Sequence, residues 1–125
     1  MSQVDSRPMR VVIVDDDEEH LSMVSRMLRV EGCDVETTSS PFGVSNLVAA
    51  FRPDVVLIDV NIPALSGDKI LSVLRRHQSK ARLVLFSAAD ESTLRRLADE
   101  VGADAWIQKG GDAKEMAQKL LNLVR

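Results

Sequence analysis

The chain has 125 residues, of which 45% are hydrophobic and 28% are charged, a balance typical of a single folded domain. A net charge of -3, with three Phe, one Trp and no Tyr, argues against nucleic-acid binding through a basic or base-stacking surface. No apolar run has membrane-spanning length, the N-terminus lacks a signal peptide's apolar core, and the single cysteine, Cys33, excludes an internal disulfide. We therefore expect a cytoplasmic protein that binds neither nucleic acid nor membrane, with Cys33 as a small core residue.

Strand and helix patterns alternate along the chain after residues 1–9, a polar segment that we expect to be a flexible tail. Continuous apolar runs predict strands buried on both faces at residues 10–14, 54–59 and 82–87. Mixed runs predict more exposed strands at residues 33–38 and 104–109. Apolar residues at helical spacing predict helices at residues 18–31, 40–51, 67–77, 90–101 and 112–124.

Capping residues mark several of these helix ends. Asp17 and Asp90 precede helical patterns and are expected to be N-caps. Ser40 is the expected N-cap of the helix at residues 40–51, with Pro41 at its first position. Gly102 is expected to end the helix at residues 90–101.

The alternation of five strands with five helices predicts an α/β fold, in which a parallel sheet carries helices on both faces. The three apolar strands should be central, and the mixed strands at residues 33–38 and 104–109 should be edges. The doubly wound order 2-1-3-4-5 has this property. It places a ligand crevice at the carboxyl ends of the first and third strands.

Polar residues stand at the carboxyl ends of four predicted strands: Asp15 and Asp16, then Asp59, Ser87 and Lys109. Two carboxylates about 4 Å apart repel by ~4 kcal/mol at an effective dielectric constant near 20, so an acidic cluster needs a counter-charge. Mg²⁺ prefers a few carboxylates together with water. A metal-held Asp beside an ammonium and a hydroxyl group is suited to accept a phosphoryl group.

These motifs resemble the receiver domain of two-component response regulators, as found in single-domain CheY-like proteins. The resemblance rests on VDDD at 14–17, LIDVNIPALSG at 57–67, LFSA at 85–88 and WIQK at 106–109. It covers essentially the whole chain, so it implies a receiver domain at residues 10–125 with a flavodoxin-like (βα)5 fold.

The resemblance also implies a role for each residue of the acidic motifs. Asp59 would be the phosphoacceptor and a metal ligand. Asp16 would bind Mg²⁺ directly, Asp15 would bind it through water, and Asn61 would supply a backbone carbonyl. Asp17, the third acid of its motif, is better explained as a helix N-cap.

Further roles follow for the later motifs. Ser87 would hydrogen-bond the phosphoryl group and Lys109 would pair with it, while Pro63 and Gly67 would shape the loop after the acceptor. Trp106 falls at the aromatic switch position that works with Ser87, although plain core packing explains it equally well.

Two residues depart from the family pattern, and two histidines fall outside it. Gly110 follows Lys109 where the family usually has a cis-linked Pro, and a non-proline cis bond costs ~2.5–4 kcal/mol, which leaves the reach of Lys109 open. Trp106 replaces the usual Tyr, Phe or His, and its bulk is expected to restrict an inward swing. His20 and His77 are predicted on helices away from the acidic cluster.

The resulting hypothesis is a phosphorylation-controlled switch and not a turnover enzyme. A histidine kinase or phosphotransfer protein would donate the phosphoryl group to Asp59 in a reaction that needs Mg²⁺. Output is expected through a downstream protein, because the last predicted helix closes at Arg125 with no DNA-binding module after it, unless the chain is a fragment of a larger regulator. One alternative is a pseudo-receiver, a phosphorylation-independent interaction module. A Mg²⁺-dependent phosphatase is less favoured, because Asn61 stands where such enzymes carry a second acid.

Overall fold

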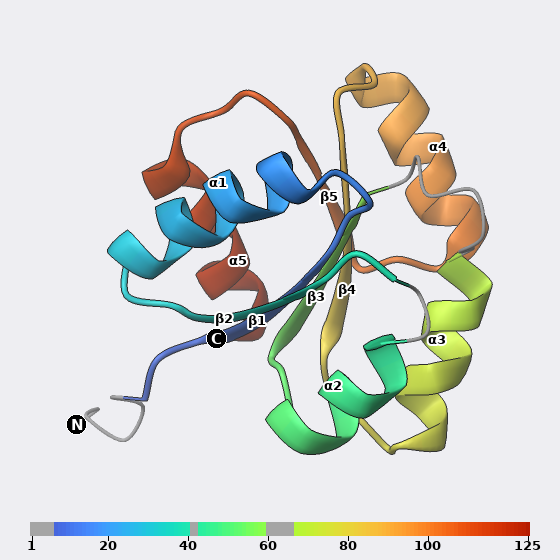
Figure 1. Cartoon of the computed structure of the whole chain (residues 1–125). Coiled ribbons are helices and arrows are strands. Elements are labelled where there is room, and N and C mark those ends of the chain that lie inside the picture. Colours follow the sequence, from blue (N-terminus) through green and yellow to red (C-terminus); the bar gives the residue numbers. More distant parts are fainter. Residues whose placement is uncertain (1–6, 41–42, 60–66) are drawn as a thin grey trace.

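The computed structural model describes residues 7–40, 43–59 and 67–125 (Figure 1). Its centre is a five-stranded parallel sheet with the order β2-β1-β3-β4-β5, which confirms the predicted α/β topology. The strands are β1 (Arg10–Val14), β2 (Asp34–Thr38), β3 (Val55–Asp59), β4 (Arg82–Ser87) and β5 (Ala105–Gln108). The helices are α1 (Glu18–Val30), α2 (Val44–Phe51), α3 (Gly67–Arg76), α4 (Glu91–Val101) and α5 (Ala113–Val124).

The burial of each strand explains its place in the sheet. Every residue of β3 is buried, and in β1 and β4 only the first residue is not. The edge strands β2 and β5 keep exposed or half-buried residues, as their mixed composition predicts. Central strands of a parallel sheet are covered on both faces, so only continuous apolar runs can fill them.

Two hydrophobic cores lie on opposite faces of the sheet. The α1–α5 core contains Val11 and Ile13 of β1 together with side chains of α1 and α5, and Cys33 lies in it as expected. The α2–α4 core contains Val12 and Val14 with side chains of α2, α3 and α4. Figure 1 shows α1 and α5 on one side of the strands and the other three helices on the other. Alternate residues of one strand therefore serve different cores.

The structure confirms the capping residues of two helices. Asp17 accepts hydrogen bonds from the backbone N of Glu19 and His20, at 3.1 and 3.2 Å. Asp90 accepts one from Thr93 N at 2.8 Å, and Gly102 ends α4 in the left-handed conformation, with φ of 77°.

The predicted start of α2 is wrong. Its N-cap is Gly43, with no side-chain capping bond, and not Ser40. Thr38 Oγ1 donates to Ser40 O and accepts from Ser40 N, so residues 38–40 form a local turn before the helix. A Cβ atom on Gly43 would lie 2.6 Å from Thr38 Oγ1, which explains the glycine there. Pro41, expected at the first helical position, lies outside the described residues.

The residue before β1 belongs to the folded domain. Met9 is buried in the α1–α5 core, and its carbonyl oxygen accepts a hydrogen bond from Asp34 N at 2.9 Å. Among the helices in the described ranges, none is long and apolar enough to cross a bilayer.

Candidate functional site

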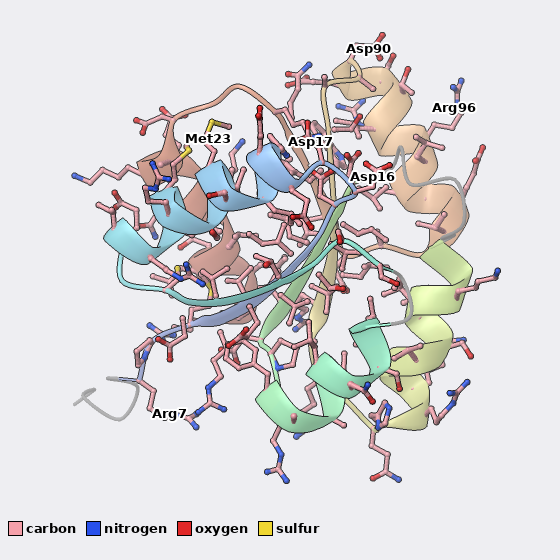
Figure 2. All side chains as sticks on the ribbon, in the orientation of Figure 1. Arg7, Asp16, Asp17, Met23, Asp90 and Arg96 are labelled. Carbon is pink, nitrogen blue, oxygen red and sulfur yellow. The ribbon has the colours of Figure 1, made fainter. Side chains whose placement is uncertain are left out.

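The carboxyl ends of the strands form one edge of the sheet, here called the rim. Asp15 and Asp16 follow β1, Asp59 is the last residue of β3, Ser87 is the last residue of β4, and Lys109 follows β5. Parallel pairing places these ends side by side, because Val14 lies beside Ile58 of β3, and Asp59 beside Phe86 of β4. Figure 2 labels Asp16 at the turn between β1 and α1.

Three carboxylates converge at the rim. Asp15, Asp16 and Asp59 each offer one oxygen atom, and these atoms all lie within 4.8 Å of one another. Asp15 and Asp59 are buried, at 0% and 5% exposure, whereas Asp16 is exposed. Such a set of oxygen atoms suits a hard divalent cation. Asn61, the further expected ligand, lies outside the described residues, as does Pro63.

Lys109 reaches the acidic cluster. Its Nζ lies 3.1 Å from Asp59 Oδ2 and 3.7 Å from Asp15 Oδ2. Its backbone N donates to Ser87 O at 2.8 Å, which holds the end of β5 beside β4. Gly110 has φ of 94°, a conformation that glycine adopts without steric cost, and the described residues contain no cis peptide bond. One ammonium offsets only one of three carboxylate charges, so the cluster keeps a negative charge that a divalent cation would balance.

Ser87 lies at the rim with a defined orientation. It is 2% exposed, and its Oγ accepts a hydrogen bond from Ala89 N at 3.1 Å. Within β4 it follows Phe86, the neighbour of Asp59 across the sheet. The structure thus brings a hydroxyl group to the same edge as the acids and the lysine.

Trp106 stands beside the site and not in it. Within β5 it pairs with Leu85 of β4, and its half-buried indole packs against the α2–α4 core. It lies three residues before Lys109 on the strand that leads to the rim.

The prediction that His20 lies away from the acidic cluster is wrong. His20 Nδ1 lies 2.5 Å from Asp15 Oδ2, and the imidazole stacks on Phe86 with ring centroids 5.5 Å apart. Because Asp17 caps α1 directly after the rim, a residue in the first turn of α1 must lie close to it. That spacing was the signal in the sequence, and it was overlooked.

The second histidine does lie on the surface, as predicted. His77 follows the end of α3, is exposed, and its Nε2 lies 2.9 Å from Ser45 Oγ. Asp17 also keeps the role expected of it, since its side chain caps α1 and is not among the three carboxylates of the cluster.

Comparison with known proteins identifies the same family in a domain model and in curated relatives. The family model described as "Response regulator receiver domain" matches residues 11–121. The chain is 34% identical over 127 residues to the "Probable transcriptional regulatory protein TcrX" of Mycobacterium tuberculosis, with 100% of this chain and 53% of that protein covered. It is 31% identical over 117 residues to the "DNA-binding response regulator MtrA" of Mycobacterium bovis, with 94% and 51% covered. The chain thus spans about half the length of these curated relatives.

Solved structures agree with these matches. The signal receiver domain of the putative response regulator NarL from Mycobacterium tuberculosis aligns with a TM-score of 0.79 and 26% identity, over 94% of this chain and 97% of that one. The chemotaxis protein CheY4 of Vibrio cholerae aligns with a TM-score of 0.79 and 25% identity, over 93% and 98%. The range matched by the family model contains every rim residue described above.

Proposed function

Because the chain belongs to the response regulator receiver domain family of two-component systems, we propose that Asp59 accepts a phosphoryl group from a phosphohistidine. The donor is a histidine kinase or a phosphotransfer protein. The observation that carries this proposal is the surroundings of Asp59: a buried carboxylate with two further carboxylates within 4.8 Å and an ammonium at 3.1 Å.

The chemistry is an in-line phosphoryl transfer. A carboxylate oxygen of Asp59 attacks phosphorus, and the P–N bond to the donor imidazole breaks as the new O–P bond forms. The electron pair of the broken bond stays with the imidazole, which takes up a proton. Lys109 Nζ, which donates a hydrogen bond to Asp59, neutralises charge on the phosphoryl oxygens. In phosphoryl transfer, positioning and electrostatic stabilisation of this kind supply most of the catalysis.

The acidic cluster also fits the Mg²⁺ ion that receiver domains generally bind. Asp16 would bind the ion directly, Asp15 would bind it through water, and Asp59 would bind it directly. The backbone carbonyl of Asn61 is the fourth proposed contact. When bound, Mg²⁺ supplies positive charge that screens the acids from one another and from the incoming phosphoryl oxygens.

We further propose that Ser87 and Trp106 transmit the phosphorylated state. The Ser87 hydroxyl moves towards the phosphoryl group and leaves its bond with Ala89 N. Space then opens beside β5, where the half-buried Trp106 turns inward and changes the surface formed by α4, β5 and α5. A downstream protein reads that surface, while the DNA binding named for MtrA is a statement about that relative.

Intact mass after incubation with Mg²⁺ and acetyl phosphate tests the central assignment. The wild type should gain one phosphoryl group, in a reaction that requires Mg²⁺. Asp59→Asn should gain none. Asp99→Asn, which removes an exposed carboxylate of α4, is the matched control and should be modified like the wild type.

The same assay separates the alternative functions. An unmodified wild type, under conditions that modify a known receiver, would refute the phosphoacceptor assignment and support a phosphorylation-independent interaction module. The position of Lys109 argues against that module, because its Nζ lies 3.1 Å from Asp59 Oδ2 even though Gly110 follows it. Repeated hydrolysis of a phosphate ester, with no accumulating adduct, would instead indicate a phosphatase.

A further inference from the structure

We propose that His20 is a positioning residue of the metal site, which holds the Asp15 carboxylate in place and thereby raises the affinity for Mg²⁺. The inference rests on the proposed function, since it assumes that the acidic cluster binds the ion. It adds a residue that the motifs of the rim do not contain, from a different element, the first turn of α1.

The contact itself has a defined direction. His20 Nδ1 lies 2.5 Å from Asp15 Oδ2, and because a carboxylate that binds a cation is ionised and only accepts hydrogen bonds, Nδ1 is the donor in the metal site we propose. The other oxygen, Asp15 Oδ1, accepts a hydrogen bond from Asp17 N at 3.0 Å. Both oxygens of Asp15 are therefore held, one by the backbone and one by His20.

The imidazole is itself fixed. It stacks on Phe86 with a centroid distance of 5.5 Å and an interplanar angle of 23°, and the His20 side chain is only 17% exposed. Phe86 is 2% exposed and lies beside Asp59 in the sheet. A donor that is packed against a core side chain loses little further conformational freedom when its acceptor binds a water molecule of the cation.

Lys109 is a competing hydrogen-bond donor for the Asp15 carboxylate, and His20 keeps it from taking that place. Lys109 Nζ lies 3.7 Å from the same Asp15 Oδ2, and it bonds Asp59 Oδ2 at 3.1 Å. Without the imidazole, Lys109 becomes the nearest donor for Asp15 Oδ2. Their ion pair, now 3.7 Å long, would then shorten, drawing Lys109 from Asp59 and turning Asp15 away from the cation.

Asp16 provides the contrast. It is exposed, and its side chain has no hydrogen bond or ion pair with another residue in the described part of the chain. A flexible ligand adds charge to a metal site but little preorganisation. The geometric order of the site therefore depends on the two buried carboxylates, Asp59, which Lys109 holds, and Asp15, which His20 holds. Loss of a hydrogen bond to a metal-ligating side chain commonly costs about 10–100-fold in metal affinity.

Two substitutions separate the donor from the ring. His20→Phe keeps an aromatic ring against Phe86 but has no donor. His20→Asn places an amide donor near the position of Nδ1 but loses the stacking. Mg²⁺ affinity is measured by calorimetry on the unphosphorylated chain, and the melting temperature is measured without metal.

If His20 positions Asp15, His20→Phe weakens Mg²⁺ binding by about tenfold or more, while His20→Asn stays close to the wild type. Stability changes in the opposite order, because His20→Asn loses packing and melts lower than His20→Phe. Phosphorylation of His20→Phe by acetyl phosphate is slower at low Mg²⁺ and recovers at saturating Mg²⁺.

Two outcomes would overturn the proposal. Either Mg²⁺ affinity follows the melting temperature across the two variants, or His20→Phe binds Mg²⁺ as tightly as the wild type. In the second case a wild type that binds Mg²⁺ and is phosphorylated leaves the proposed function intact, so only the role of His20 fails. A wild type that binds no Mg²⁺ refutes the metal site and the role of His20 together.

Discussion

Replacing Asp16 with Asn should stabilise the metal-free protein, because it relieves repulsion within the acidic cluster. The oxygen atoms of the three carboxylates lie within 4.8 Å of one another. At that separation and an effective dielectric constant near 20, two carboxylates repel by ~3.5 kcal/mol. Since Asp16 is exposed, solvent and salt screen much of this, and about 1–2 kcal/mol remains at low ionic strength.

This free energy corresponds to a measurable shift. With ~2.1 cal/mol/K of unfolding entropy per residue, a domain of this length gains about 4 °C in melting temperature per kcal/mol. Asp16→Asn should therefore melt roughly 4–8 °C above the metal-free wild type. Mg²⁺ at ten times its dissociation constant should stabilise the wild type by ~1.4 kcal/mol, or about 5 °C, and should leave Asp16→Asn unchanged.

The assay is thermal unfolding followed by circular dichroism at low ionic strength, with and without Mg²⁺. Asp17→Asn is the matched control, because it makes the same substitution one residue later, outside the cluster, and Asn caps a helix as well as Asp does. It should keep the Mg²⁺ response of the wild type. A wild-type response in Asp16→Asn, or a lower melting temperature without metal, would refute the reasoning.

Two other expectations concern the optical probe and the dependence on pH. Phosphorylation should change the fluorescence of Trp106, the only tryptophan. Ser87→Ala should still accept the phosphoryl group but show a smaller fluorescence change. Full phosphorylation of the wild type without a fluorescence change would mean that Trp106 is a fixed core residue. A backbone hydrogen bond from Thr93 lowers the pKa of Asp90, so its stabilisation of α4 is complete above the ordinary pKa and is lost as pH falls through the lowered one. The melting temperature should thus fall more on acidification in the wild type than in Asp90→Asn, and equal falls would contradict this.

The order of the strands was predictable because burial leaves a direct record in composition. A strand covered on both faces, such as β3, must be apolar throughout, whereas an edge strand such as β2 can alternate. The start of α2 was not predictable in the same way. Ser40 followed by Pro41 is a sound capping signal, but Thr38 offers a competing local turn, and only the folded backbone shows which bonds form.

The site divides along similar lines. The three acids could be brought together from strand order alone, since each directly follows or ends a strand at one edge. Whether Lys109 would reach Asp59 was left open, because Gly110 replaces the usual proline of the family; in the structure Lys109 does reach it, with Gly110 at a φ of 94°. His20 was missed because its importance comes from the direction in which α1 leaves the rim, a property of two elements together.

Because side chains alternate along a strand, the residues behind the site belong to two separate cores that can change independently in evolution. Phe86, which supports His20, belongs to the α1–α5 core, whereas Leu85 and the half-buried Trp106 belong to the α2–α4 core. Ser87 alternates with Phe86 and so faces the side of Leu85. Under the proposed function, substitutions on the α1–α5 side would change the affinity for Mg²⁺, while those on the α2–α4 side would change the response of Ser87 and Trp106. If Asp59 is the acceptor, as we propose, variation on the two faces would change metal affinity and output separately while Asp59 is kept.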